Sequence, residues 1–146
     1  MAVPTDICLP ALVLPKGGGV ELWNRVERER DFTTREWQRK DWAQLLVFDA
    51  ADYRWPVAEA KPFDPVPILA RLFSRVGYNP TLTVQLLFAA PEPSDLTELK
   101  RALAQRVEDS EDGLTQMLDR DRLKALVLAA TSFADLLARL KKYRVV

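Results

Sequence analysis

The chain has 146 residues, of which 48% are hydrophobic and 29% are charged, the balance of a globular protein rather than of a disordered or fibrous one. Its 21 basic residues equal its 21 acidic residues, so no field of one sign is available to gather nucleic acid or an anionic membrane. The absence of histidine excludes Ser-His and Cys-His catalytic pairs and histidine metal ligands, and a single cysteine excludes an intramolecular disulfide. These counts predict one cytoplasmic domain over residues 1–146.

Residues 1–19 are predicted to form an extended N-terminal arm that ends in a glycine-rich turn. Leu9–Leu14 is short and apolar, and it is closed by Pro15 and by the glycines at 17–19. Because prolines cannot donate to a strand ladder, we expect this segment at the edge of a sheet. The next stretch, Val20–Arg30, alternates apolar and charged residues and is interpreted as a strand, although a polar helix also fits.

A capping box and a hairpin are predicted in the next part of the chain. Thr33 and Glu36 have the spacing of a capping box, so a short helix should follow them. Leu45–Asp49 and Tyr53–Val57 are predicted to pair as a β-hairpin, with aspartates at its turn. Pro56 should place the second strand at an edge or a bulge.

A proline-rich connection and one long strand come next. The prolines at 62, 65 and 67 precede a short predicted helix whose apolar residues are Ile68, Leu69 and Leu72. Thr81–Phe88 alternates regularly in polarity, so it predicts the clearest strand of the chain.

From Ser94 onward the apolar residues recur at helical spacing. We expect a first helix capped by Asp95, a second capped by Asp119 or Asp121, and a third capped by Ser132. The acidic run at 108–112 should break the first helix and form a solvated loop. The fold class predicted is α+β, with a small antiparallel sheet from the first two thirds packed with helices and an all-helical C-terminal third.

No catalytic residue, metal site or cofactor site is predicted. Carboxylates alone can act as acid and base or bind Mg²⁺, but the three acidic clusters have simpler roles in a turn, a loop and a helix cap. The glycines at 17–19 lack the following helix and lysine of a phosphate loop, and Cys8 has no basic neighbour that would lower its thiol pKa.

The residues predicted to contact a partner lie in two regions. All four tryptophans fall in the first half of the chain, where either core packing or an interaction face explains them. Tight interfaces concentrate their binding energy in tryptophan, tyrosine and arginine, so Trp23, Trp37 and Arg54 are the first candidates. A second candidate is the acidic loop, which could meet a basic partner through Glu108, Asp109, Glu111 and Asp112.

Several phrases, in order along the chain, resemble small bacterial immunity proteins of polymorphic toxin systems. They are Asp31–Trp37, the pair Leu46–Asp49 and Tyr53–Trp55, Gly77–Pro80 before a long strand, Leu96–Lys100 and Ala130–Leu137. The resemblance implies an α+β protein with its sheet early and its helices late, which binds and occludes a toxin domain. It carries over no functional residue.

The composition, the neutral charge and the resemblance together predict a non-enzymatic protein-binding module, such as an immunity protein that neutralises a toxin. Two alternatives stay open. One is a carboxylate-dependent, Mg²⁺-type hydrolase. The other is a homo-oligomeric accessory or structural protein whose exposed strand edge pairs with a second copy.

Overall fold

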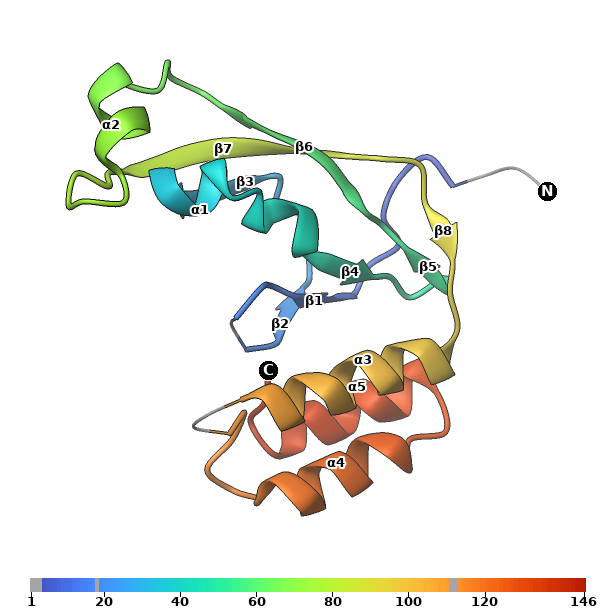
Figure 1. Ribbon diagram of the computed structural model, residues 1–146. Coiled ribbons are helices and arrows are strands. Elements are labelled where there is room, and N and C mark those ends of the chain that lie inside the picture. The colour runs from blue at the N-terminus through green and yellow to red at the C-terminus, as the bar shows by residue number, and fades with distance from the viewer. Residues whose placement is uncertain (1–3, 18, 111–112) are drawn as a thin grey trace.

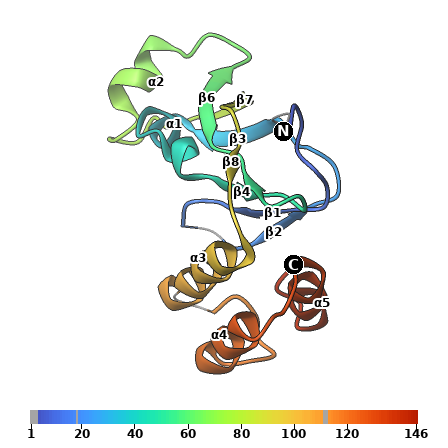
Figure 2. The same ribbon diagram turned by 90° about the vertical axis from the view of Figure 1, so that its right-hand side faces the viewer.

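The computed structural model describes residues 4–17, 19–110 and 113–146 and has three layers (Figure 1). Helices α3 (Leu96–Asp109), α4 (Arg120–Leu128) and α5 (Phe133–Lys142) form one outer layer. A five-stranded sheet forms the middle layer and a three-stranded sheet forms the other outer layer (Figure 2). The predicted α+β fold with a helical C-terminal third is confirmed, although its strands form two sheets instead of one.

All strand pairs in both sheets are antiparallel. The five-stranded sheet has the order β2-β1-β4-β5-β8, and the three-stranded sheet has the order β3-β7-β6. The strands of the first are β1 (Ala11–Leu14), β2 (Glu21–Trp23), β4 (Leu46–Phe48), β5 (Tyr53–Arg54) and β8 (Glu92–Pro93). Those of the second are β3 (Glu29–Thr33), β6 (Val57–Pro62) and β7 (Thr81–Phe88). The single strand expected over Val20–Arg30 is therefore two strands in different sheets.

Strand β1 lies in the centre of the protein. Its residues alternate between two cores, because successive side chains of a strand point to opposite faces. Leu12 and Leu14 pack against the C-terminal helices, whereas Ala11 and Val13 pack against the three-stranded sheet. Since β1 pairs with β2 on one side and with β4 on the other, the expectation of an edge strand is wrong. The prolines flank β1 and so remove no bond from its ladder.

The predicted hairpin is confirmed at its turn but not along its second strand. Strands β4 and β5 pair through Phe48 and Arg54, and the Asp49 amide donates to the Tyr53 carbonyl over 2.9 Å. Beyond β5 the chain crosses to the other sheet, where Val57 begins β6. Trp55 is buried at this crossing, and Pro56 belongs to neither strand. The predicted strand is thus divided between the two sheets.

The helix caps follow the predicted pattern. The side chains of Asp95, Asp119 and Ser132 each accept a hydrogen bond from the backbone amide three residues later, at 2.8–3.0 Å. Helix α3 runs to Asp109, so the acidic run begins inside the helix rather than breaking it at residue 108. Within the described part of the chain, none of the helices has the length and apolarity of a membrane span.

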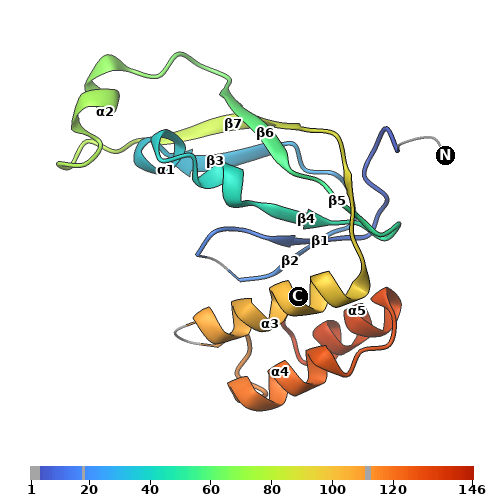
Figure 3. The ribbon, with the colours of Figure 1, turned by 45° about the vertical axis from the view of Figure 1, so that its right-hand side comes forward.

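Three short helical segments accompany the three-stranded sheet, and the last of them stands at one end of it (Figure 3). They are α1 (Thr34–Gln38), the 3-10 helix η1 (Asp41–Gln44) and α2 (Ile68–Phe73). The predicted capping box starts α1: the Glu36 amide donates to the Thr33 hydroxyl, and the Thr33 amide donates to the Glu36 carboxylate. Helix α2 lies in the connection between β6 and β7, on the far side of the molecule from α3–α5.

Candidate functional site

The connection around α2 exposes a cluster of large apolar side chains. Of the eleven large apolar residues that are exposed in the described part of the chain, seven fall between positions 63 and 78. We call these seven the α2 surface: Phe63, Ile68, Leu69, Leu72, Phe73, Val76 and Tyr78. Their exposed fractions range from 46% to 76%, far above those of the core residues, which are at most 9%.

Helix α2 packs against the body of the protein through its small side chains. Ala70 is fully buried and Ser74, the C-cap residue, is 5% exposed, and the two lie four positions apart. Positions four residues apart share one face of a helix, so Ile68, Leu69 and Leu72 are left on other faces. The polarity of the helix is therefore the reverse of the usual amphipathic pattern, with small residues inward and large apolar residues outward.

Side-chain hydrogen bonds hold α2 against α1. The Ser74 hydroxyl donates to Oε1 of Gln38 over 2.8 Å, and Nε2 of Gln38 donates to the Arg71 carbonyl over 3.1 Å. Polar groups make both of these bonds, so α2 is held against α1 without the help of its exposed apolar side chains in this hydrogen bonding.

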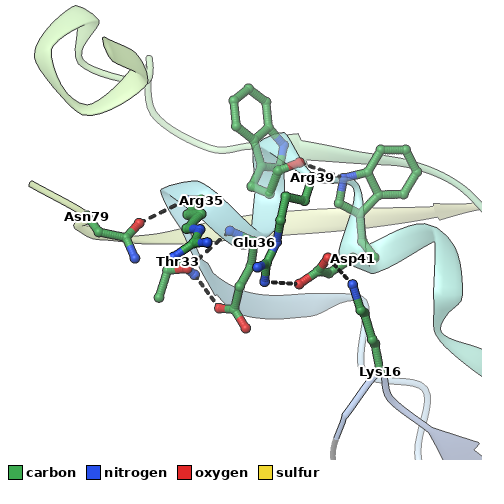
Figure 4. A network of polar contacts seen from close by, with 9 residues as sticks. Lys16, Thr33, Arg35, Glu36, Arg39, Asp41 and Asn79 are labelled. Atoms are coloured by element: carbon green, nitrogen blue, oxygen red, sulfur yellow. Dashed lines mark hydrogen bonds and ion pairs between the residues drawn. The ribbon is translucent and has the colours of Figure 1, made fainter. Parts of the chain in front are cut away.

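Both ends of the connection are also fixed. The Phe63 amide donates to the Thr83 carbonyl over 3.1 Å, beside the β6–β7 ladder. At the other end, the Arg35 amide donates to Oδ1 of Asn79 over 2.8 Å (Figure 4). Thr34 donates to the Pro80 carbonyl through both its amide and its hydroxyl. The apolar side chains are thus carried by a backbone that is anchored before and after them.

Trp23, a predicted partner-binding residue, is part of the core between the two sheets. Its side chain is 2% exposed, and its ring meets Phe88 edge to face with the ring centroids 6.3 Å apart. Its indole N–H has no acceptor among the described residues. Of the two explanations given for the tryptophans, core packing therefore applies to Trp23. A partner has no access to its side chain.

Trp37 is half-buried and covers the outer edge of β6. Its indole N–H donates to the Ala60 carbonyl over 3.0 Å, and its own carbonyl accepts from the indole of Trp42 over 3.3 Å. The Trp37 indole therefore satisfies a backbone carbonyl on the open edge of β6, where no further strand of the described residues pairs.

Arg54 is engaged inside the molecule. Its guanidinium bonds Glu92 of β8 and, over 3.0 Å, Glu98 in the first turn of α3. The hydrogen bond that Arg54 donates to Glu92 raises the pKa of Arg54, against the effect of partial burial. Arg54 thus links the middle sheet to the helical layer, on the other side of that sheet from Trp23 and Trp37. The three predicted residues therefore do not form one face.

The acidic candidates at 108–112 are only partly described. Glu108 is exposed and pairs with Lys124 over 2.7 Å, and this hydrogen bond lowers the pKa of its carboxyl. Asp109 accepts from Nε2 of Gln105 over 2.9 Å. Glu111 and Asp112 lie outside the described residues. The two described members therefore already have partners within the helical layer.

The carboxylates near the hairpin turn are used for structure. Asp49 is 2% exposed and accepts four hydrogen bonds, from the amides of Cys8, Ala51 and Tyr53 and from the indole of Trp55, at 2.8–3.2 Å. Asp52 is exposed at a turn position with φ of 63°. Among the described residues, no group of three acidic, cysteine or histidine side chains is placed to hold a metal ion.

An open groove separates the β1–β2 turn from the C-terminal half of α3. Its basic lining residues are Lys16, which pairs with Asp41, and Arg106, which donates to the Pro15 carbonyl. Burial lowers the pKa of Arg106. Both cations have internal partners, so the groove offers no strong candidate for ligand recognition.

Comparisons with protein-family models, with curated proteins and with solved structures find no match to this chain.

Sequence reasoning missed the α2 surface because an apolar stripe in a helix is ordinarily read as core. One signal was present. Ala70 and Ser74 are small residues four positions apart, whereas Ile68, Leu69 and Leu72 around them are large. A six-residue helix cannot bury both faces against one neighbour, so these small residues indicated which face is inward.

Proposed function

We propose that this chain is a non-enzymatic protein-binding module and that its partner binds the α2 surface. The observation that carries the proposal is the concentration of seven exposed large apolar side chains within sixteen positions of one connection. Large contiguous apolar patches on a folded protein mark sites of interaction, whereas single exposed apolar residues do not.

The energetics of burial favour this assignment. Each large apolar side chain gains about 1.5–3 kcal/mol when it moves from water to a buried position. Leu69 and Leu72 are 61% and 68% exposed, so most of that free energy is still available to a complex.

The anchoring of the connection supports the same proposal. Because its ends and α2 itself are held by hydrogen bonds to α1 and β7, the surface is ordered before a partner arrives. A surface that is already ordered loses less conformational entropy on binding.

The resemblance to immunity proteins suggests the class of partner, a toxin domain that the chain would occlude. We place this activity in the cytoplasm as part of the same proposal, since a chain with one cysteine has no disulfide to maintain.

The proposal can be tested with two matched double variants. Leu69→Gln with Leu72→Gln removes apolar area from the α2 surface, and glutamine keeps a good helix propensity. Met117→Gln with Leu128→Gln is the control, because these residues are also half-exposed but lie outside the patch, at 54% and 48%. Wild type and both variants are used to capture proteins from the organism that encodes the chain, and a captured protein is then purified and titrated.

We expect a protein that binds wild type and the control equally and that loses at least about thirtyfold in affinity for the α2 variant. All three forms should melt within about 2 °C of one another, since the changed side chains lie on the surface. A captured protein that binds the α2 variant as tightly as wild type would contradict the proposal.

A further inference from the structure

The α2 surface is bordered by cations that have no ion pair with any described residue. Arg71 lies within α2, Arg75 follows it, and Arg35 lies on the neighbouring α1, and all three are exposed. Elsewhere the structure pairs many of its cations. Arg30 bonds Glu21 and Arg139 bonds Asp135, at 2.6 Å and 3.1 Å.

Few carboxylates stand near these arginines. Asp64 is the one acidic residue between positions 60 and 80, against Lys61, Arg71 and Arg75. On α1, Glu36 adds a second carboxylate, so two carboxylates stand against the four cations Arg35, Lys61, Arg71 and Arg75. The rim of the α2 surface is therefore basic, although the whole chain is neutral.

We infer that the partner presents a segment whose apolar side chains are flanked by carboxylates. This inference rests on the proposed function and adds the chemistry of the partner to it. Arginine holds a carboxylate through two parallel hydrogen bonds, so Arg71 and Arg75 fit acidic side chains at the border of an apolar contact. Charges at such a border select the partner and set its orientation.

A second copy of this chain fits the surface less well. A symmetric dimer through the α2 surface would bring the same arginines of the two copies to one interface, where like charges repel.

An anionic membrane also fits less well. Basic surfaces that bind anionic lipid cluster about four to eight lysines and arginines, and Arg35, Lys61, Arg71 and Arg75 only reach the lower end of that range. The chain also has no net positive charge that would attract anionic lipid from a distance.

A display library of random peptides about 16 residues long, or about four helical turns, tests the inference directly. The library is selected on wild type and counter-selected on Leu69→Gln with Leu72→Gln. Selected peptides are synthesised and titrated against wild type, against Arg71→Glu with Arg75→Glu, and against the control Arg101→Glu with Lys141→Glu, which makes the same charge change on α3 and α5.

We expect the selected peptides to combine apolar residues with aspartate and glutamate. Their affinity should fall by about tenfold or more in the Arg71/Arg75 variant, and when salt is raised from about 50 to 500 mM, but not in the control variant. If the selected peptides are neutral or basic and bind the Arg71/Arg75 variant as tightly as wild type, the inference is overturned while the proposed function stays intact. A library without α2-dependent peptides would also overturn it, and the capture experiment would then decide the proposed function separately.

Two further measurements exclude the other occupants. Sedimentation of the protein alone should show a monomer; a dimer that Leu69→Gln with Leu72→Gln dissolves would overturn the inference in favour of a second copy. Co-sedimentation with phosphatidylserine-containing vesicles should show no binding that depends on the α2 surface, and such binding would overturn it in favour of a membrane.

Discussion

At the scale of single residues, Asp49 shows how one buried carboxylate organises the centre of the fold. It accepts from the N-terminal segment through the Cys8 amide, from its own turn through the Tyr53 amide, and from the crossing between the sheets through Trp55. The sequence predicted Asp49 at a turn, and that is confirmed. Its bonds to Cys8 and Trp55 were not predictable, because they depend on how distant segments come together.

Replacing Asp49 with alanine should lower the free energy of unfolding by at least about 2 kcal/mol, because several buried donors lose their acceptor. Denaturant melts measure this loss. Asp52→Asn is the control, since asparagine also tolerates the left-handed conformation of that exposed position, and it should change stability by less than about 0.5 kcal/mol. Equal losses in the two variants would contradict this account of Asp49.

Asp41 is a buried carboxylate whose charge is matched by two cations (Figure 4). Burial raises its pKa, but the hydrogen bonds from Lys16 and Arg39, at 3.0 Å and 2.8 Å, outweigh burial and hold the pKa below its ordinary value of 3.8. The unfolded chain then takes up a proton at this position more readily than the folded protein does. The stability that Asp41 contributes is therefore present above about pH 4 and is lost as the pH falls through its folded-state pKa.

Between pH 7 and about pH 3, the free energy of unfolding should fall less in Asp41→Asn than in wild type, because the variant has no proton to take up at this position. Urea melts at the two pH values measure the difference. The exposed Asp64→Asn serves as the control and should fall as wild type does. An identical fall in all three proteins would show that Asp41 is not held ionised by its partners.

At the scale of elements, the capped helices and strand β7 were predictable because local side-chain chemistry determines them. Thr33, Asp95 and Ser132 each cap a helix through the amide three residues on, and that spacing is visible in the sequence. Strand pairing was not predictable in the same way. The prolines beside β1 suggested an edge strand. Whether both sides of β1 are paired depends on β2, which follows after a turn, and on β4, which is remote in the sequence.

Helix α5 is docked by the apolar stripe that the sequence indicated. Leu136, Leu137 and Leu140 are all buried in the core beneath the middle sheet. Leu137→Ala should therefore cost about 2–5 kcal/mol in denaturant melts, the range for a large-to-small change in a core. Leu128→Ala on α4 is the matched control, since Leu128 is 48% exposed and its truncation should cost less than about 1 kcal/mol. A loss below about 1 kcal/mol at Leu137 would mean that α5 is not docked as described.

At the scale of the whole molecule, the two cores and the α2 surface have different roles. The core between the helices and the middle sheet, and the core between the two sheets, bury Trp23 and Trp55 together with most of the large apolar residues of the strands. The α2 surface lies outside both cores, at the end of the molecule farthest from α3–α5 (Figure 1). The sequence placed its partner-binding candidates at Trp23, Trp37, Arg54 and residues 108–112 instead of around α2, because exposure is a property of the assembled layers.

Amide hydrogen exchange of the chain, with and without its captured partner at saturation, tests whether the partner binds the α2 surface. Added protection should be concentrated in residues 63–78, with a smaller effect in α1, because these residues form and support the α2 surface. Protection centred on Trp37, on Arg54 or on the end of α3, with residues 63–78 exchanging as they do in the free protein, would contradict binding at the α2 surface.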